Sequence, residues 1–175
     1  SEVMIRNYVI LLLIICCSML AAAGVSISPE LAFEPNRGQF GGAVSYGARA
    51  QGYAVGVDGH TFRLKLGKGA GASTDVSLSF EGANPASQPS GRRLLAGRSN
   101  YIGYDPKARI ADVPRFAEVW YADLYPGVDL RLYGNERNLE YDLIVAPGSS
   151  AAGIVLGISG QGARITPEGD LAIEG

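Results

Sequence analysis

Two carboxylates, Glu140 and Asp142, are the residues best spaced for acid–base chemistry, because they lie two positions apart in a segment that alternates apolar and polar side chains. On a strand this spacing places both on one face, with Cα atoms roughly 6.6–6.8 Å apart. The two carboxyl groups of an inverting glycosidase lie about 6.5–9.5 Å apart. Any strand with a polar outer face produces the same spacing. A solvated face paired with Arg131 is therefore the favoured interpretation, and a cation site near Asp129 and Asp142 stays open as an alternative.

Aromatic residues offer a second kind of chemistry, since an exposed ring can stack on a sugar. Four of them lie close together in the sequence: Trp120, Tyr121, Tyr125 and Tyr133. If their segments are strands, alternate rings must serve the core. These four residues, together with Glu140 and Asp142, make up the candidate ligand-facing set.

The other reactive side chains match no catalytic motif. His60 is the only histidine and flanks a predicted turn, and no Gly-x-Ser-x-Gly elbow accompanies it. The Gly-rich stretch at residues 67–71 lacks both the spacing and the following helix of a phosphate-binding loop. We therefore predict a non-catalytic protein with no catalytic residues, no cofactor and no metal ligands.

The N-terminus has the features of a secretory signal peptide. Arg6 precedes an apolar run over residues 8–20, and three alanines end this run before Gly24. The run of about 16 apolar or small residues is shorter than the roughly 20 that span a membrane. We expect a signal helix within residues 1–23 that is cleaved, and a module over residues 24–175 that is secreted or held at the cell surface without stable membrane insertion. An uncleaved anchor is the alternative.

The composition suits one globular domain. The chain has 175 residues, of which 47% are hydrophobic and 18% charged, and its net charge is −2. These values exclude a disordered chain, and the near balance of charge argues against nucleic acid as a partner. Both cysteines, Cys16 and Cys17, lie in the predicted leader, so the module must fold without disulfides.

Short segments of alternating polarity between turn residues predict an all-β fold. The clearest hairpin spans residues 52–66, where Asp58-Gly59 suits the centre of a type I′ turn. A two-residue loop formed by Asp58 and Gly59 places the large apolar side chains of both strands on one face, and Arg63 and Lys65 on the other. The expected opposite pairs are Val57 with His60, Val55 with Phe62 and Tyr53 with Leu64.

A second hairpin is predicted over residues 128–145. The apolar residues of its two strands share one face only if the loop has two or four residues, such as residues 134–137. The four-residue loop puts Arg131 opposite Glu140. It also puts Asp129 opposite Asp142, which is a mildly unfavourable pair of like charges.

Further strands complete a predicted antiparallel β-sandwich, or two packed sheets, of roughly eleven short strands. Residues 67–73 and 82–91 have loop composition. A basic segment at residues 92–115 precedes an acidic one at residues 116–142, and charge matching between adjacent strands is the favoured interpretation of this order. The additional strands are expected at residues 43–49, 74–81, 98–103, 116–121, 153–159, 162–166 and 170–174.

Several longer motifs resemble one bacterial family. They are FEPNRGQ at residues 33–39, NYIGYDP at residues 100–106, VPRFAEVWYADLYPGVDLRLYGNERNLEYDLIVAPG at residues 113–148, and the closing GDLAI. They are similar to the N-terminal domain of unknown function that precedes SBBP-type β-propeller repeats in large secreted or surface proteins. The resemblance implies that this chain is the N-terminal part of a longer protein, with propeller or Ig-like domains downstream as its partners. It transfers no catalytic residue.

These observations favour a non-catalytic structural or interaction module outside the bacterial cell. A module that binds polysaccharide or matrix is the alternative, and an accessory domain of a secreted hydrolase is the weakest hypothesis. Solvent-facing aromatic rings in one plane would favour binding, whereas carboxylates that converge in a cleft would favour catalysis.

Overall fold

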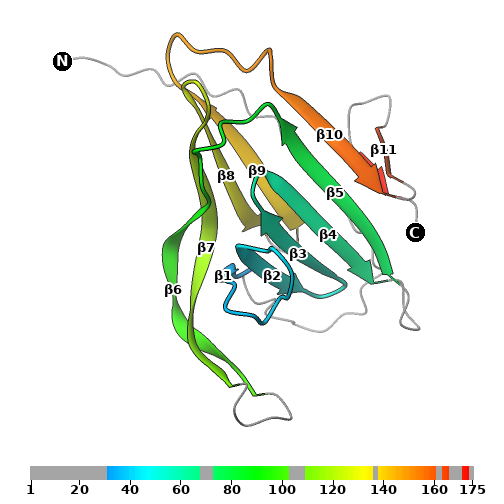
Figure 1. The fold of residues 1–175 in the computed structure, drawn as a ribbon, viewed down its shortest axis with the longest axis vertical. Coiled ribbons are helices and arrows are strands. Elements are labelled where there is room, and N and C mark those ends of the chain that lie inside the picture. Colours follow the sequence, from blue (N-terminus) through cyan, green and yellow to red (C-terminus); the bar gives the residue numbers. More distant parts are fainter. Residues whose placement is uncertain are drawn as a thin grey trace, which may run out of the picture.

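The protein is all-β, as the sequence predicts (Figure 1). The structure, a computed structural model, describes residues 31–67, 73–102, 109–135, 138–160, 163–165 and 171–173; for residue 138 and the last two segments it describes the backbone alone. None of these segments is helical. A search of the same segments for a helix able to cross a bilayer finds none. The predicted signal helix within residues 1–23 lies outside the described residues.

The strands form two packed antiparallel sheets and a small hairpin, which confirms the predicted two-sheet architecture. The six-stranded sheet has the order β1-β2-β3-β4-β5-β10, the four-stranded sheet has the order β6-β7-β8-β9, and β11 pairs with β12. Their bounds are β1 Glu34–Pro35, β2 Tyr46–Ala50, β3 Tyr53–Asp58, β4 Thr61–Gly67, β5 Ser73–Glu81, β6 Ser90–Tyr101, β7 Ile110–Tyr125, β8 Val128–Asn135, β9 Asn138–Val145, β10 Val155–Gly160, β11 Ala163–Ile165 and β12 Leu171–Ile173.

The core lies between the two sheets. Phe62 and Phe80 of the six-stranded sheet meet edge to face, with ring centroids 5.5 Å apart, and Phe80 meets Tyr141 of β9 at 5.9 Å. Tyr121 of β7 lies beside Phe62, and both Tyr121 and Leu130 are fully buried. Because the apolar side chains point inward from both sheets, the outer faces are left for solvent and ligands.

The β3–β4 hairpin keeps the predicted faces in a different register. Asp58 pairs with Thr61, so Gly59 and His60 are the central turn residues instead of Asp58 and Gly59. Gly59 has a φ of 53°, and glycine at the first central position suits a type II′ turn. The predicted register is therefore wrong by two residues, although a shift of two leaves every side chain on its predicted face. The observed pairs are Val57 with Phe62, Val55 with Leu64 and Tyr53 with Leu66.

The β8–β9 hairpin differs from its prediction in the same way. Asn135 pairs with Asn138, so the loop has two residues instead of four. The predicted pairs of Arg131 with Glu140 and of Asp129 with Asp142 are wrong. The shared apolar face is confirmed, because the inward side chains of both strands are buried. The observed pairs include Arg131 with Asp142, Asp129 with Ile144 and Leu130 with Leu143.

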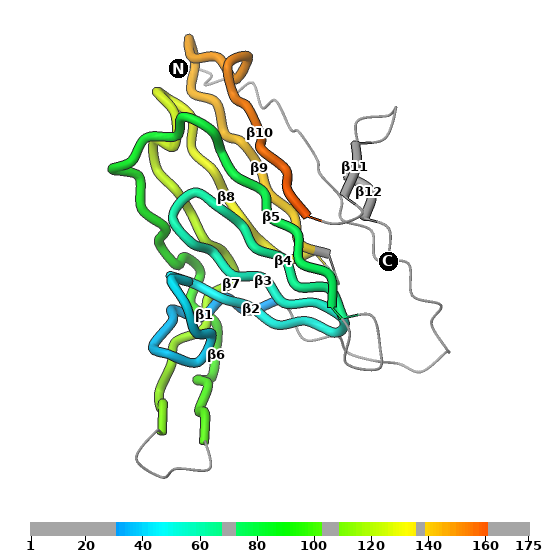
Figure 2. The backbone as a smooth tube through the Cα atoms, turned by 45° about the vertical axis from the view of Figure 1, so that its right-hand side comes forward, coloured from blue at the N-terminus to red at the C-terminus, as the bar shows by residue number. Residues whose placement is uncertain are grey.

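Strands β6 and β7 extend beyond both sheets as a long two-stranded arm (Figure 1, Figure 2). The sequence predicts strands for only parts of the arm, at residues 98–103 and 116–121, and it assigns Ser90 to a loop although β6 begins there. The alternation is broken at Arg93 and Asp112, which have φ values of 55° and 56°, and the β6–β7 register shifts along the arm. A strand that bulges in this way does not show a period of two.

The segment before β1 and β1 itself join the arm to the six-stranded sheet. Phe33 exchanges two backbone hydrogen bonds of 2.8 Å with Phe116 of β7, while β1 pairs with β2. Glu34 is buried and accepts a hydrogen bond of 2.6 Å from the Tyr101 hydroxyl, near the end of β6. Arg37 donates to two backbone carbonyls at the start of β7. The FEPNRGQ motif therefore fixes the arm in place.

Candidate binding face

The outer side of the four-stranded sheet carries the candidate site. Trp120 of β7 lies opposite Ser90 of β6 and Arg131 of β8, so polar residues flank it on both sides. The guanidinium carbon of Arg92 lies 4.5 Å from the centroid of the Trp120 ring, which is a cation–π distance. We refer to this surface as the guanidinium face; it comprises Arg92, Arg93, Glu118, Trp120, Arg131, Tyr133, Asn135, Glu140 and Asp142.

Glu118 is the acidic centre of the guanidinium face. Its carboxylate accepts hydrogen bonds from Trp120 Nε1 at 2.7 Å and from Arg93 Nη1 at 3.0 Å, and Arg131 Nη1 lies 3.9 Å away. Burial alone would raise the pKa of Glu118, but the hydrogen bonds and the two guanidinium charges outweigh it and hold the pKa below its ordinary value. Glu118 is therefore an ionised anchor that fixes the orientation of the Trp120 ring.

Arg131 connects Glu118 to the next strand. Its guanidinium donates two hydrogen bonds to Asp142, from Nε at 3.1 Å and from Nη2, and its guanidinium carbon lies 4.4 Å from the centroid of the Tyr133 ring. Burial raises the pKa of Tyr133 to about 12, with the neighbouring carboxylates adding to the shift. The Tyr133 hydroxyl thus stays neutral and donates to Asp142 Oδ1 at 3.3 Å. Two ring–guanidinium stacks, joined through Glu118, run across the sheet.

Glu140 has a separate set of partners on the same face. Its carboxylate accepts a hydrogen bond from Asn135 Nδ2 at 3.0 Å, and only 4% of the residue is exposed. Asp142 is engaged by Arg131, and its side chain is 14% exposed. Glu140 and Asp142, whose spacing in the sequence is similar to that of glycosidase carboxylates, are therefore each held by a neighbouring side chain. Both lie on a sheet face.

The structure brings four of the six predicted ligand-facing residues together: Trp120, Tyr133, Glu140 and Asp142. Tyr121 points the other way, is fully buried, and donates a hydrogen bond to the Gly59 carbonyl. Tyr125 packs against the core, and its hydroxyl donates to the Glu81 carbonyl at 2.7 Å. Tyr121 and Tyr125 are therefore not part of the guanidinium face.

Five members of the guanidinium face are absent from the predicted set, namely Arg92, Arg93, Glu118, Arg131 and Asn135. The feature of the sequence that points to Arg92, Arg93 and Glu118 is the basic segment at residues 92–115 followed by the acidic segment at residues 116–142. The two arginines lie in the basic segment, on β6, and Glu118 lies in the acidic segment, on β7. Arg93 reaches Glu118 because its positive φ turns its side chain toward the face that Arg92 also occupies. A local backbone bulge of this kind has no marker in the sequence, since Arg93 is not a glycine.

The arrangement is suited to stacking and hydrogen bonding. Among the residues that the structure describes, no group of three or more His, Cys, Asp or Glu side chains could hold a metal ion. His60 lies away from the guanidinium face, beside Tyr121, with its Nε2 atom 2.9 Å from the Ser87 carbonyl. What the guanidinium face offers a ligand is ring edges, guanidinium groups and carboxylates fixed in position.

Comparison with known proteins gives one match. Residues 33–175 match a family described as Domain of unknown function (DUF7948). No curated protein matches the chain. A search of solved structures likewise gives no match. The matched range begins at Phe33, so it covers the motif that holds the arm as well as the guanidinium face.

Proposed function

The chain belongs to the DUF7948 family, and we propose that it is a non-catalytic, extracellular interaction module that binds acidic polysaccharide through its guanidinium face. The observation that carries this proposal is the pair of stacked arrangements on one outer face, Arg92 over Trp120 and Arg131 over Tyr133. Rings held in one layer of a rigid sheet are suited to sugar binding because little conformational entropy is lost when a ligand is bound.

The exposure of the charges favours an anionic sugar. In the pair of Arg93 with Glu118, 66% of the arginine side chain is exposed but only 7% of the glutamate. In the pair of Arg131 with Asp142, the corresponding values are 33% and 14%. The cations therefore lie nearer to solvent than the anions, and a carboxylate on a sugar can meet a guanidinium in a bidentate geometry.

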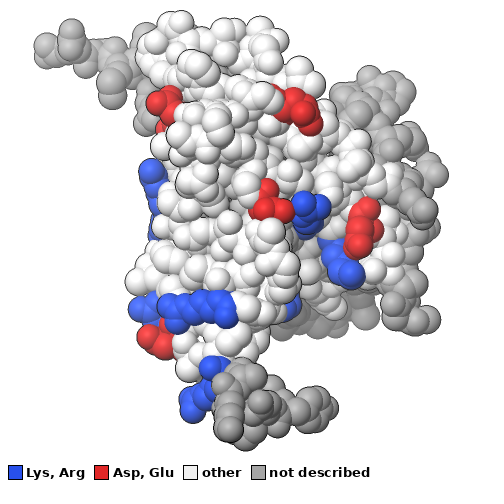
Figure 3. All heavy atoms as spheres, in the orientation of Figure 1, with Lys and Arg blue, Asp and Glu red and all other residues white. Residues whose placement is uncertain are grey.

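Basic side chains also lie on the arm. Arg98, Arg109 and Arg115 lie on or beside β6 and β7, and blue side chains are visible along the arm in the space-filling view (Figure 3). Asp112 pairs with Arg98 at 3.6 Å and offsets one of these charges.

Affinity electrophoresis tests this function. The wild-type chain should be retarded in a gel that contains alginate, an acidic polysaccharide, and should run unretarded in dextran, which is neutral. The double variant Arg92→Gln, Arg93→Gln should lose the retardation. The matched control Arg63→Gln, Lys65→Gln removes two positive charges from the other sheet and should keep it. Equal loss in both variants would reveal a non-specific charge effect and contradict the proposal.

The setting of the module is part of the same proposal. The apolar N-terminal run, its alanine triplet and the absence of cysteine after residue 17 support secretion, or display at the cell surface. The resemblance of the FEPNRGQ and YPGVDL motifs supports a position ahead of SBBP-type propeller repeats, which would be its partners in the same chain. Intact-mass measurement of the secreted protein tests the first point: a mass beginning at or near Gly24 is expected, and a retained N-terminus would contradict it.

A further inference from the structure

Strand β10 extends the six-stranded sheet beyond the last strand of the four-stranded sheet. That last strand, β9, faces β5, since Tyr141 contacts Phe80. On the other side of β5 from β4, Leu156 of β10 pairs with Phe80 and Ile158 pairs with Leu78. Paired residues point to the same side of a sheet, so Leu156 and Ile158 point inward. Both pack against the core but remain partly exposed.

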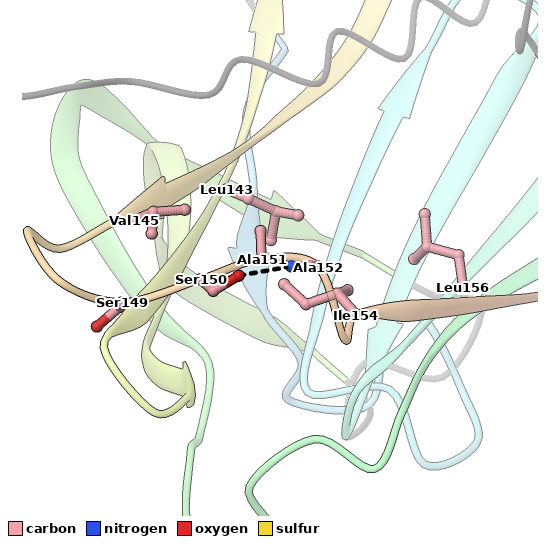
Figure 4. Close-up of a pocket in the computed structure, with 8 residues that line it drawn as sticks. All are labelled: Leu143, Val145, Ser149, Ser150, Ala151, Ala152, Ile154 and Leu156. Atoms are coloured by element: carbon pink, nitrogen blue, oxygen red, sulfur yellow. Dashed lines mark hydrogen bonds between the residues drawn. The ribbon is translucent and has the colours of Figure 1, made fainter.

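An apolar pocket of about 510 Å³ lies between β9 and β10. Leu143 and Val145 of β9 form one wall, Ile154 and Leu156 form the other, and the loop of residues 149–152 closes one end (Figure 4). Pockets that hold small ligands have volumes of about 300–1,000 Å³. This pocket shares no residue with the guanidinium face, so an inference from it is independent of polysaccharide binding.

The lining of the pocket offers a ligand mainly hydrocarbon. The described lining residues are branched aliphatic residues, alanines and two serines, and none of them is charged. Ser150 Oγ accepts a hydrogen bond of 3.2 Å from the backbone N–H of Ala152. Ser149 Oγ lies so close to Gly127 that a Cβ at that position would collide with it. Both hydroxyls are thus turned to the chain itself, and a charged ligand group would lose its hydration without gaining a partner.

Backbone hydrogen bonds hold the loop that closes the pocket. The Ala146 N–H donates to the Gly127 carbonyl at 2.9 Å, and the Ser149 N–H donates to the Ala146 carbonyl at 3.0 Å. The Ile154 N–H donates to the Ala151 carbonyl at 3.1 Å. The pocket is therefore formed before a ligand enters, and little conformational entropy is lost on binding.

We propose that this pocket binds a single neutral hydrocarbon chain, such as the alkyl chain of a fatty alcohol or the acyl chain of a lipid. A flexible chain can lie between the aliphatic walls of β9 and β10, where each methylene group leaves water. A peptide segment fits the lining less well, because its own N–H and C=O groups would be buried against side chains that form no hydrogen bond with them.

The first test measures the binding of octanol, decanol and dodecanol to the full chain by equilibrium dialysis. Each alcohol should bind with a stoichiometry of one chain per protein. The affinity should rise roughly fourfold for each added methylene group, and it should stop rising once the chain fills the pocket. The absence of saturable binding, or a stoichiometry well above one, would overturn the proposal.

The second test changes the size of the pocket. Leucine has three more side-chain carbons than alanine, so Ala151→Leu should shorten by about three carbons the chain length at which the affinity stops rising. Val145→Ala should lengthen it. The matched control is Ala54→Leu, because Ala54 is also partly buried but lies on β3 and does not line the pocket. Circular dichroism verifies that each variant is folded. The same length limit in the wild type and in both pocket variants would overturn the proposal.

The third test identifies the source of the chain and the rival occupant. If the chain is drawn from a bilayer, the wild type should float with vesicles of phosphatidylcholine, a neutral lipid, and Ala151→Leu should not. A protein that binds the alcohols but does not float takes a free chain, which also agrees with the proposal. Binding of a peptide of alternating valine and threonine, without binding of any alcohol, would overturn the proposal and identify a strand as the occupant.

Discussion

Arg131 lies directly opposite Asp142 in the β8–β9 ladder, donates two hydrogen bonds to it, and stacks on the ring of Tyr133 beside it. The same guanidinium approaches Glu118 of β7. One arginine thus links three strands of the guanidinium face. The rings keep their positions because charged hydrogen bonds fix them from strand to strand.

Replacing Arg131 should therefore destabilise the fold. Arg131→Met removes the two hydrogen bonds and the ion pair of Asp142, whose side chain is 14% exposed, and leaves it only the Tyr133 hydroxyl. It also removes one of the two guanidinium groups near Glu118, whose side chain is 7% exposed. We expect a loss of about 1–3 kcal/mol in the free energy of unfolding, measured by urea titration. The control is Lys65→Met, which removes the ion pair of Lys65 with Asp75, whose side chains are 64% and 73% exposed. This control should change the free energy of unfolding by about 0.5 kcal/mol or less. Equal losses in the two variants would contradict the account.

Stability should depend on pH through Glu118. Its pKa is lower in the folded protein than its ordinary value, so its contribution is fully present above about pH 4.5 and is lost as the pH falls through the folded pKa. Glu118→Gln lacks this contribution at every pH. The difference in unfolding free energy between the wild type and Glu118→Gln should therefore shrink from pH 6 to pH 3. A constant difference over this range would show that Glu118 is not held ionised by its neighbours.

Two buried tyrosines should respond in opposite ways to loss of the hydroxyl. The Tyr141 hydroxyl is buried and has no hydrogen-bond partner among the described residues, whereas the Tyr121 hydroxyl donates to the Gly59 carbonyl. Tyr141→Phe should be neutral or stabilising, because it removes an unsatisfied polar group. Tyr121→Phe should cost about 0.5–1.5 kcal/mol. Thermal unfolding of both variants measures these changes in stability. A greater loss of stability for Tyr141→Phe than for Tyr121→Phe would contradict the assignment of the hydrogen bond to Tyr121.

Leu130 tests the position of the core. It is fully buried between the sheets, so Leu130→Ala should cost about 2–5 kcal/mol in a denaturant titration. Leu94 is 60% exposed on the arm, and Leu94→Ala should change stability by about 0.5 kcal/mol or less. Similar values for the two variants would mean that the apolar side of β8 does not face the core.

The sequence was sufficient to predict which side chains face the core, but not the register of the hairpins. Alternation assigns Val55 and Leu130 to buried faces whichever two-residue shift is taken. The shift itself depends on contacts distant from the turn. His60 lies within the first turn while its ring meets Tyr121 and the Ser87 carbonyl, and Arg131 gains Asp142 as a partner only in the observed register.

The arm and the full guanidinium face could not be predicted for a related reason. Strand prediction from alternation requires one covered side and regular pairing, whereas β6 and β7 bulge at Arg93 and Asp112 and extend beyond the sheets. Glu118 was visible in the sequence only as one of several acids. Its role depends on Trp120, two residues away on the same strand, and on arginines from both neighbouring strands.

The most direct test of the binding function uses Trp120, the only tryptophan in the chain, as a fluorescent reporter on the guanidinium face. Titration with alginate oligosaccharides should change its emission in a saturable way, and dextran oligosaccharides of the same length should not. Arg92→Gln, Arg93→Gln should weaken the alginate response by roughly tenfold or more, as expected for the loss of charge-assisted hydrogen bonds. An emission spectrum that stays unchanged with alginate at millimolar concentration would contradict the proposal that this face binds acidic polysaccharide.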